Sequence, residues 1–350
     1  MAIENEKSKR TELSELGEFD LIDRLTEGLT PLNHSTIKGV GDDAAVMQYD
    51  NHSLILLAND ILIEGVHFDL TYTPLKHLGY KAGVVNFSDI YAMNGAPKQL
   101  VIGLGVSNRF SVEALDEFYE GLRLACHHYG VDLVGGDISS SKTGMFISIS
   151  VVGEVSKDEV VYRNGAQLDN LICVSGDLGA AYMGLLLLER EKRVYLANPN
   201  MQPDLEGNDY VLERQLKPEA RKDIIRLLHE ACIQPTAMID ISDGLASEIL
   251  HICKQSNKGC VIYEDKIPID PATLLLCDEF KIIPAIAALH GGEDYELLFT
   301  IPLSEYEKIE KVENISLIGH ITDSSEGCQL ITNDGKQIPL QAQGWNHLRK

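Results

Sequence analysis

Aspartates beside small residues recur along this chain. Glycine lets a backbone approach a ligand closely, and carboxylate oxygens are the hard ligands that Mg²⁺ prefers. Each segment alone is more typical of a turn or a helix cap, but together they predict a shared site for several metal ions. Ligands of open α/β sheets bind at strand ends, where most of these segments are expected. The segments are Gly41-Asp42-Asp43-Ala44, Ala58-Asn59-Asp60, Ser88-Asp89, Gly135-Gly136-Asp137, Asp240-Ile241-Ser242-Asp243-Gly244 and Gly291-Gly292-Glu293-Asp294.

Two of these segments are difficult to explain without a cation. Asp240 follows an apolar strand and precedes Asp243 by three positions, so two acids at a strand-to-helix junction would repel each other. Asp89 lies in a largely apolar helical stretch, where an unpaired carboxylate is costly. A metal ion would account for both, although a salt bridge from Lys81 or Lys98 would also satisfy Asp89.

The composition restricts the partners of the chain. Its 350 residues favour two domains, and 44% apolar with 24% charged residues is typical of a globular protein. Thirty basic against 53 acidic residues give a net charge of −23, which disfavours binding to nucleic acid or to an anionic membrane surface. A chain this acidic is expected to bind phosphates through divalent cations held by its carboxylates.

Seven cysteines are scattered along the chain without a C-x-x-C pair. This spacing favours neither a zinc site nor a disulfide framework, so we expect buried, reduced thiols in a cytoplasmic protein. The N-terminal residues are polar and lack the apolar core of a signal peptide. The most apolar stretch, 178–188, contains two glycines and is too short to span a bilayer. We therefore expect no membrane partner.

Short β-rich segments alternate with helical patterns, which predicts an α/β (α+β) fold. A polar stretch at 158–163 predicts a first domain, 1–158, and a second, 159–350. Residues 190–216 are polar, and we expect them to form a surface excursion between helices. The expected strands are Leu54–Ala58, Leu100–Gly105, Val131–Val134, Phe146–Val152, Leu171–Val174, Ala237–Ile239, Leu297–Ile301, Leu317–Ile321 and Gln329–Ile331. The expected helices are 78–93, Ser111–Tyr129, Ala180–Leu188, Ala220–Cys232 and Leu245–Cys253.

The common phosphate-binding motifs are absent from the sequence. There is no G-x-x-x-x-G-K-[ST] P-loop and no H-R-D or D-F-G set of a protein kinase. The G-x-S-x-G motif of a serine hydrolase is missing as well. Phosphate chemistry in this chain would therefore rely on the aspartate segments.

Further motifs stand between the aspartate segments. In chain order they are Glu15-Leu-Gly-Glu-Phe-Asp-Leu-Ile-Asp23, Glu64-Gly-Val-His67-Phe, Val85-Asn-Phe-Ser-Asp89, Arg163-Asn-Gly-Ala166, Leu216-Lys-Pro and Gly344-Trp345. With the aspartate segments they cover nearly the whole chain. In this order they resemble the thiamine-monophosphate kinase family, of the aminoimidazole ribonucleotide synthetase and selenophosphate synthetase superfamily. The acidic motifs alone would indicate only the superfamily.

The resemblance implies a two-domain fold like that of aminoimidazole ribonucleotide synthetase. It also implies ATP-dependent transfer of a γ-phosphoryl group to thiamine monophosphate, which gives thiamine diphosphate. The N-terminal α/β domains would pair in a homodimer, with ATP bound between domains. Several Mg²⁺ ions and a K⁺ ion would accompany the reaction. No residue is assigned as a general base, because the attacking phosphate oxygen is already anionic.

The resemblance also implies roles for individual residues. Outside the resemblance, Arg163 could make a linker salt bridge, Trp345 could cover a core edge, and His67 could be a satisfied loop histidine. The implied metal ligands are Asp43, Asp60, Asp89, Asp137, Asp240 and Asp243. The implied ATP-binding residues are Gly136, Arg163, Ser242 and Tyr119, and the implied contacts to the thiamine end are His67, Glu293 and Trp345.

One departure from the family pattern leaves other functions open. The family usually places two hydroxyl residues before the second metal aspartate, and this chain has Ala58 and Asn59 there. A paralogue that binds thiamine phosphates without catalysis would explain that change. Another ATP-dependent enzyme of the superfamily is the second alternative. A selenophosphate synthetase is disfavoured, because no cysteine precedes Cys126.

Overall fold

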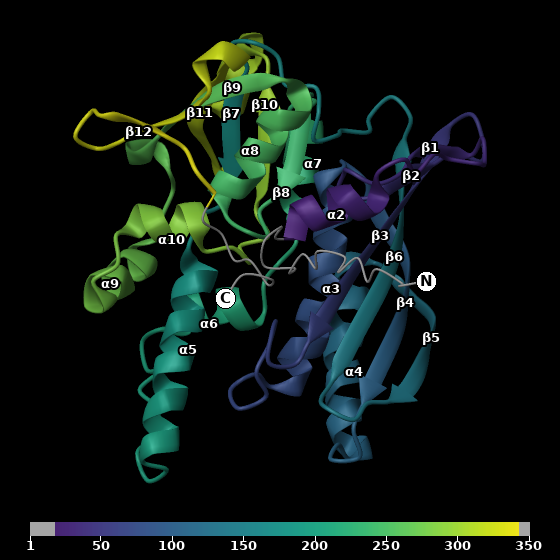
Figure 1. The fold of residues 1–350 in the computed structure, drawn as a ribbon, viewed down its shortest axis with the longest axis vertical. Coiled ribbons are helices and arrows are strands. Elements are labelled where there is room, and N and C mark those ends of the chain that lie inside the picture. The colour runs from purple at the N-terminus through teal and green to yellow at the C-terminus, as the bar shows by residue number, and fades with distance from the viewer. Residues whose placement is uncertain (1–17, 343–350) are drawn as a thin grey trace, which may run out of the picture.

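The computed structural model describes residues 18–342 and contains two β-sheets (Figure 1). The first sheet has six strands in the order β1-β2-β3-β6-β4-β5. All neighbouring strands in it are antiparallel except β4 and β5, which are parallel and joined by a crossover helix. The strands are β1 (Thr36–Lys38), β2 (Ala45–Met47), β3 (Ser53–Ile63), β4 (Ala96–Val106), β5 (Asp132–Ser140) and β6 (Phe146–Ser156).

Two long helices, α3 (Leu75–Ala92) and α4 (Val112–Tyr129), pack against each other and accompany this sheet; the short α2 (Glu18–Thr26) precedes it. The backbones of α3 and α4 come unusually close. A Cβ at Gly79 would lie 1.9 Å from the carbonyl oxygen of Phe118, and one at Gly121 would lie 1.7 Å from that of Lys76. Glycine at both positions is therefore required for this helix contact.

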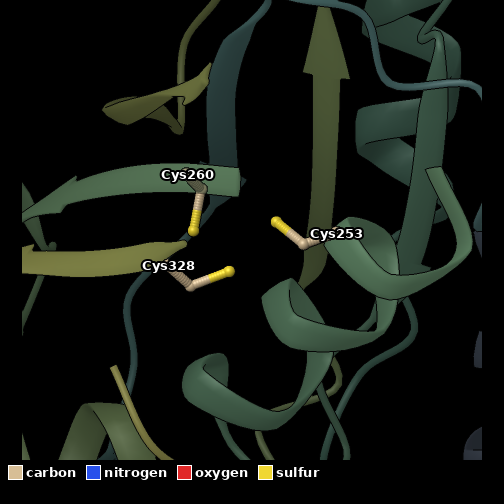
Figure 2. A group of neighbouring side chains, drawn as sticks. All are labelled: Cys253, Cys260 and Cys328. Atoms are coloured by element: carbon tan, nitrogen blue, oxygen red, sulfur yellow. The ribbon is translucent and has the colours of Figure 1, made fainter. Parts of the chain in front are cut away.

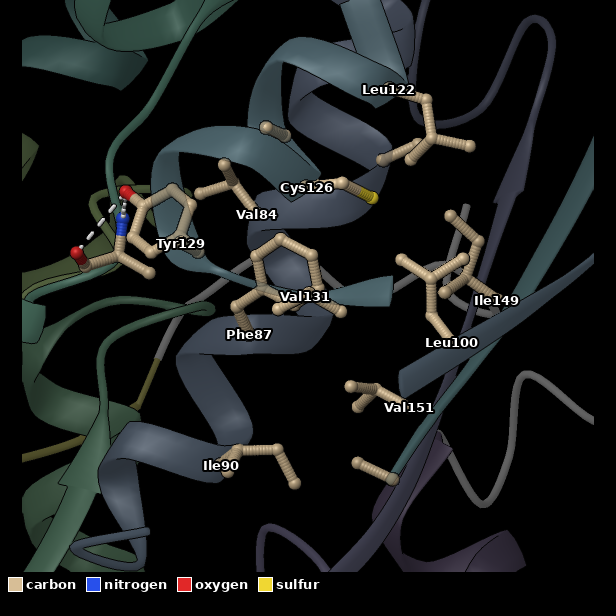
Figure 3. Packing of buried hydrophobic residues seen from close by; sticks show 14 of the residues in the cluster. Val84, Phe87, Ile90, Leu100, Leu122, Cys126, Tyr129, Val131, Ile149 and Val151 are labelled. Carbon is tan, nitrogen blue, oxygen red and sulfur yellow. Dashed lines mark hydrogen bonds between the residues drawn. The ribbon is translucent and has the colours of Figure 1, made fainter. Parts of the chain in front are cut away.

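The core of the first domain lies between α3, α4 and one face of the sheet. Figure 3 shows apolar side chains from both helices meeting Leu100 and Val151 of the strands. At one edge of this core the backbone N–H of Ala220 donates to the Tyr129 hydroxyl at 2.9 Å, and that hydroxyl donates to Glu219 at 2.6 Å. The first core is thereby attached to a segment that follows the linker to the second domain.

The second sheet has seven strands in the order β13-β12-β9-β11-β7-β10-β8. Its pairs are antiparallel except β12 and β9. The strands are β7 (Leu171–Ser175), β8 (Ala237–Asp240), β9 (Lys258–Tyr263), β10 (Leu297–Ile301), β11 (Ile315–Asp323), β12 (Cys328–Ile331) and β13 (Gln337–Pro339). The helices are α5 (Ala180–Ala197), α6 (Asp209–Leu216), α7 (Lys222–Glu230), α8 (Leu245–Ser256), α9 (Pro271–Phe280), α10 (Pro284–His290) and α11 (Tyr306–Ile309).

The α/β fold class is confirmed, but several predicted elements are too short, among them β3, β5 and α5. Strand β3 continues to Ile63, so Asp60 lies within a strand rather than at its end. Strand β5 continues through its two glycines to Ser140, because parallel pairing with β4 extends to Val106. Helix α5 continues to Ala197. Five charged residues at 189–193 interrupt its apolar sequence, which is why the prediction ended the helix at residue 188.

The expectation of a surface excursion over 190–216 is wrong at both ends. Residues 190–197 belong to α5 and residues 209–216 form α6, which packs on α5. Val211 of α6 is fully buried against the apolar face of α5, so tertiary contact rather than local propensity stabilises this helix. In Figure 1, α5 projects downward beside α6.

The linker between the sheets runs from Ser156 to Leu171. The predicted boundary at 158/159 falls within it, and its position stays a prediction. Within residues 18–342, no helix has both the length and the apolar character needed to cross a membrane.

Candidate active site

Three aspartates from distant parts of the sequence converge between the two sheets. Asp43 comes from the loop before β2, Asp89 from α3 and Asp240 from the end of β8. One carboxylate oxygen of each lies within 4.8 Å of the others. We call these three residues the carboxylate cluster. It forms where α3 of the first domain meets β8 of the second.

Local structure explains why these side chains are held in place. Strand β8 is entirely buried, and its last residue, Asp240, accepts a hydrogen bond of 2.6 Å from the Ser88 hydroxyl. Ser88 precedes Asp89 in α3, so one turn of this helix presents both a donor to Asp240 and a further carboxylate. The sequence alone did not indicate this role of Ser88 in orienting Asp240.

Burial and mutual repulsion disfavour ionisation in the carboxylate cluster. Burial raises the pKa of Asp43 to about 7, although the positive charge of Arg163 opposes the shift. Burial also raises the pKa of Asp240 to about 6, against the hydrogen bond from Ser88. The pKa of Asp89 is raised well above its ordinary value by burial and by the neighbouring charges of Asp60 and Asp240. Without a cation these carboxyls therefore retain their protons to a higher pH than usual, and a bound cation would favour their ionised forms.

The cluster fits a divalent cation by its geometry as well as by its charge. Arg163 donates from Nη2 to Asp43 Oδ1 at 2.7 Å. The second oxygen of Asp43, Oδ2, is buried and has no hydrogen-bond partner among the described residues. Hard carboxylate oxygens with an unused buried lone pair are suitable ligands for Mg²⁺. Arg163 therefore does form a salt bridge, and its partner is the proposed metal ligand Asp43. The Nε atom of Arg163 has no partner in the described part of the chain.

Asp60 lies beside the cluster on the inner face of β3. Burial and the charges of Asp243 and Asp43 raise its pKa to about 6. The carboxylates of Asp60, Asp243 and Asp43 therefore lie close enough to influence one another's ionisation. The preceding Asn59 points to the opposite, exposed face, as strand alternation requires, and its amide donates to Ile149 O at 2.8 Å. Asn59 is therefore not a side-chain ligand at this position, and Ala58 on the inner face offers only packing.

A buried glutamate that sequence analysis missed stands at the start of α8. Glu248 accepts a 2.8 Å hydrogen bond from the backbone N–H of Asp243, and its other oxygen is buried without a partner in the described part of the chain. Burial and the charge of Asp243 raise its pKa well above the ordinary value. In the sequence, Glu248 is a single acid on an otherwise apolar stripe of this helix, and that pattern could have indicated a functional role. Ser242, in the same loop, is exposed.

Glu293 connects the two domains. Its carboxylate pairs with Lys81 of α3 at 3.0 Å and accepts from Gln215 of α6 at 2.8 Å. Its backbone N–H donates to Ser242 O at 2.6 Å, which links two of the predicted motifs. Lys81 therefore pairs with Glu293, and the alternative in which Lys81 neutralises Asp89 is wrong.

His67 lies in the turn after β3 and is half-buried. Its Nδ1 accepts a 3.0 Å hydrogen bond from the backbone N–H of Ile63, which places the ring proton on Nε2. A fixed tautomer with a donor at Nε2 is compatible both with substrate binding and with a satisfied loop histidine.

The remaining predicted site residues are not brought to the carboxylate cluster by any described contact. Asp137 and Gly136 lie exposed in the edge strand β5, where they pair with Gly103 and Ile102 of β4. Tyr119 is half-buried in α4 against the ring of Phe118, at a centroid distance of 5.8 Å. Trp345 lies outside the described residues 18–342. The first motif begins at Glu15, so its first three residues also lie outside them.

A second charged network, also missed by sequence analysis, supports the loop that carries Glu293. Glu296 is fully buried and pairs with Arg214 at 2.8 Å and with Arg221 at 2.5 Å. Asp294 accepts from the backbone N–H of Gly179 at 2.9 Å, and burial raises its pKa to about 7. These pairs join α6 and the segment before α7 to the start of β10.

Comparison with known proteins identifies the class of this fold and site. Residues 41–155 match the family model of the AIR synthase related protein, N-terminal domain. A solved structure described as AaThiL complexed with AMPPCP and TMP covers 97% of this chain and all of its own, at a TM-score of 0.82 and 34% identity. The fold with its buried carboxylates is therefore that of the AIR-synthase-related class.

Full-length relatives narrow the class to one family. The thiamine-monophosphate kinase of Aquifex aeolicus is 35% identical over 335 residues, which is 96% of this chain and 99% of that protein. That of Bacillus subtilis is 32% identical over 340 residues, 95% of this chain and all of that protein. The chain belongs to the thiamine-monophosphate kinase family, and the resemblance carried by the motifs is confirmed.

Proposed function

We propose that this protein transfers the γ-phosphoryl group of ATP to the phosphate of thiamine monophosphate, giving thiamine diphosphate and ADP. The observation that carries the proposal is the carboxylate cluster of Asp43, Asp89 and Asp240, in a chain that belongs to this kinase family over its whole described length. Two anionic substrates can meet on a protein of net charge −23 only where cations neutralise them.

The metal ligands of the proposal are Asp43, Asp89 and Asp240, with Asp60, Asp243 and Asp137 as further ligands. These residues would hold Mg²⁺, which would supply the positive charge that offsets the phosphate charge during phosphoryl transfer. Ser88 fixes the orientation of Asp240 through its hydroxyl, and Asn59 is excluded as a side-chain ligand because it lies on the other face of β3. K⁺ is part of the proposal as an accompanying monovalent cation.

The transfer needs positioning rather than a base. A terminal phosphate oxygen of thiamine monophosphate attacks the γ-phosphorus, and the bond from that phosphorus to the β–γ bridging oxygen breaks as ADP leaves. The attacking oxygen carries negative charge already, so no side chain has to remove a proton. Arg163 supports this role, because its unpartnered Nε can donate to a phosphate oxygen while Nη2 holds Asp43.

The two substrates are proposed to occupy different motifs. Gly136, Arg163, Ser242 and Tyr119 are assigned to ATP, while His67, Glu293 and Trp345 are assigned to the thiamine end. The imidazole of His67 is held at Nδ1 by the Ile63 N–H, and Glu293 offers a carboxylate that Lys81 and Gln215 hold in place. An anchored carboxylate is suited to a cationic thiazolium ring.

We further propose a homodimer that pairs through the first sheet. Helices α3 and α4 cover one face of this sheet, and apolar side chains stand exposed on the other. An exposed apolar sheet face of this kind is typical of an interaction surface, and a second copy of the chain is the proposed partner. The exposed apolar side chains are Leu57, Ile61, Ile63, Val101, Val134 and Phe146. The unpaired thiols of all seven cysteines favour a reducing, cytoplasmic setting for this enzyme.

The test is an assay of purified protein with ATP and Mg²⁺, in which thiamine monophosphate, thiamine and no acceptor are compared. We expect thiamine diphosphate only with the monophosphate, and none after addition of EDTA. Tight binding of thiamine monophosphate without any turnover would instead identify a non-catalytic binding protein. Turnover with a different acceptor would identify another enzyme of the superfamily.

A further inference from the structure

Three cysteines that are far apart in the sequence meet in the second domain. Cys253 lies in the last turn of α8, Cys260 in β9 and Cys328 at the start of β12. Figure 2 shows their side chains directed toward a common point. The three Sγ atoms all lie within 4.8 Å of one another. The spacing of the cysteines along the chain did not indicate this convergence.

The backbone around the thiols is fixed by secondary structure. Cys260 and Cys328 are direct partners in the parallel pairing of β9 with β12. The N–H of Cys260 donates to Gly327 O at 3.2 Å, and the carbonyl of Cys328 accepts from Leu340 N at 2.9 Å. Gly327 has a φ of +66°, a conformation that favours glycine, and so directs the chain into β12. The thiols are thus preorganised on three packed elements.

The separation of the sulfur atoms is close to that of ligands on one metal ion. Thiolates bound to Zn²⁺ at about 2.3 Å are about 3.8–4.0 Å apart in tetrahedral or trigonal geometry. Sulfur atoms at most 4.8 Å apart therefore have to converge by less than about 1 Å, which small side-chain rotations provide.

The chemistry of the donors selects the kind of ion. Thiolates are soft ligands that bind Zn²⁺ and Cu⁺ and discriminate against Mg²⁺. Cys253 and Cys260 are buried, whereas Cys328 is half-buried and gives the group one accessible side.

We propose that Cys253, Cys260 and Cys328 form a binding site for one thiophilic ion of the Zn²⁺ or Cu⁺ class, with an open position on the side of Cys328. The other buried cysteines, Cys126, Cys173 and Cys277, belong to no such group among the described residues. The cysteine site lies at the C-terminal end of α8, while Glu248 and the loop that contains Asp243 lie at the N-terminal end. A bound ion would link α8 to β9 and β12 through the three sulfur atoms.

The test uses the purified, reduced full-length protein with saturating Mg²⁺, so that the carboxylate cluster is occupied by its own ion. Zn²⁺ or, without oxygen, Cu⁺ is added, and the protein is separated from free metal. We expect one retained equivalent, and X-ray absorption at the metal edge should count three sulfur ligands at about 2.3 Å for Zn²⁺.

Variants assign the sulfur ligands. Cys328→Ser, at a half-buried position, should weaken binding by at least roughly 10–100-fold, because even groups that only orient metal ligands have effects of that size. Cys232→Ser changes an exposed cysteine outside the group and should bind like the wild type. Co²⁺ offers a second readout, because a thiolate charge-transfer band should appear in the wild type and weaken in Cys328→Ser.

Several results would overturn the proposal. Retained metal without sulfur ligands would mean an adventitious ion on surface carboxylates. A disulfide between Cys260 and Cys328 in protein isolated under reducing conditions would assign the thiols to a covalent bond. Binding that survives Cys328→Ser would exclude the three-sulfur site. If that variant does not fold, the sulfur count in the wild type decides the question alone.

Discussion

Asp89 is the residue whose surroundings most demand a cation. It sits in the last turn of α3, and the nearby charges of Asp60, Asp240 and Asp43 all oppose its ionisation. The ammonium of Lys81, about two turns earlier in the same helix, is engaged by Glu293 instead. A carboxylate in this position is costly for folding and is therefore best explained by its role toward metal.

Asp89→Asn should abolish phosphoryl transfer and leave the fold intact. Asparagine has nearly the same shape but lacks the charge, so we expect turnover to fall by at least about 100-fold, the size of effect seen when one stabilising group is removed from a transition state. Steady-state kinetics with ATP and thiamine monophosphate measure the loss. Asp116→Asn, on the exposed face of α4, is the matched control and should keep full activity.

The same pair of variants tests the metal role independently of catalysis. Mg²⁺ that binds only the folded protein should raise the melting temperature of the wild type and of Asp116→Asn. Asp89→Asn should show a much smaller rise. Near-normal turnover, or an unchanged response to Mg²⁺, in Asp89→Asn would contradict its assignment as a metal ligand.

His67→Ala should weaken binding of thiamine monophosphate more than binding of ATP. The imidazole is held in the turn after β3 by the Ile63 N–H, and loss of one hydrogen bond from this ring to the substrate would cost about 0.5–1.5 kcal/mol, or roughly a 2–10-fold effect. Titration calorimetry with each ligand gives the two affinities. The exposed His127 is the control position, and an equal loss for both ligands would argue against His67 as a substrate contact.

At the scale of elements, the start of β10 is held by buried charge. Glu296 accepts from Ser175 of β7 and pairs with Arg214 and Arg221, so a single carboxylate joins α6, β7 and the chain before α7. The loop that carries Glu293 precedes it directly. The position of a proposed substrate contact therefore depends on this ion-pair network.

Glu296→Ala should destabilise the protein by about 3 kcal/mol or more, because it leaves two buried guanidinium groups without their shared partner. Arg221 retains Asp223 at 2.8 Å, which limits the effect. Urea unfolding followed by circular dichroism measures it. Asp278→Ala breaks the exposed pair with Lys281 and should change stability little. Similar stabilities for both variants would mean that the network does not support this loop.

At the scale of the whole molecule, the uncovered face of the first sheet decides the proposed assembly. Val101→Asp places a charge on an exposed apolar position of β4, and we expect it to convert a dimer to a monomer. Analytical ultracentrifugation distinguishes the two. Leu275→Asp alters an equally apolar, exposed position on α9 and should leave the dimer unchanged. A monomeric wild type would contradict the proposal.

The amino-acid sequence was sufficient to predict the family and the α/β class, and it singled out the three aspartates that converge in the carboxylate cluster. These follow from local patterns: Gly-Asp segments, alternating apolar residues and the order of motifs along the chain. Local patterns were insufficient for α6, whose helix depends on packing Val211 against α5, and for β5, whose glycines are held in a strand by pairing with β4.

Only the tertiary structure decided which of these residues meet. Ser88 and Asp240 are 152 positions apart and share a hydrogen bond, and Glu248 joins their surroundings from α8. Cys253 and Cys328 likewise meet because β9 pairs with β12 beneath the end of α8. Spacing along the sequence fixes the direction of a side chain within its own element. The packing of one element on another fixes its neighbours, and that depends on long-range register that no local pattern records.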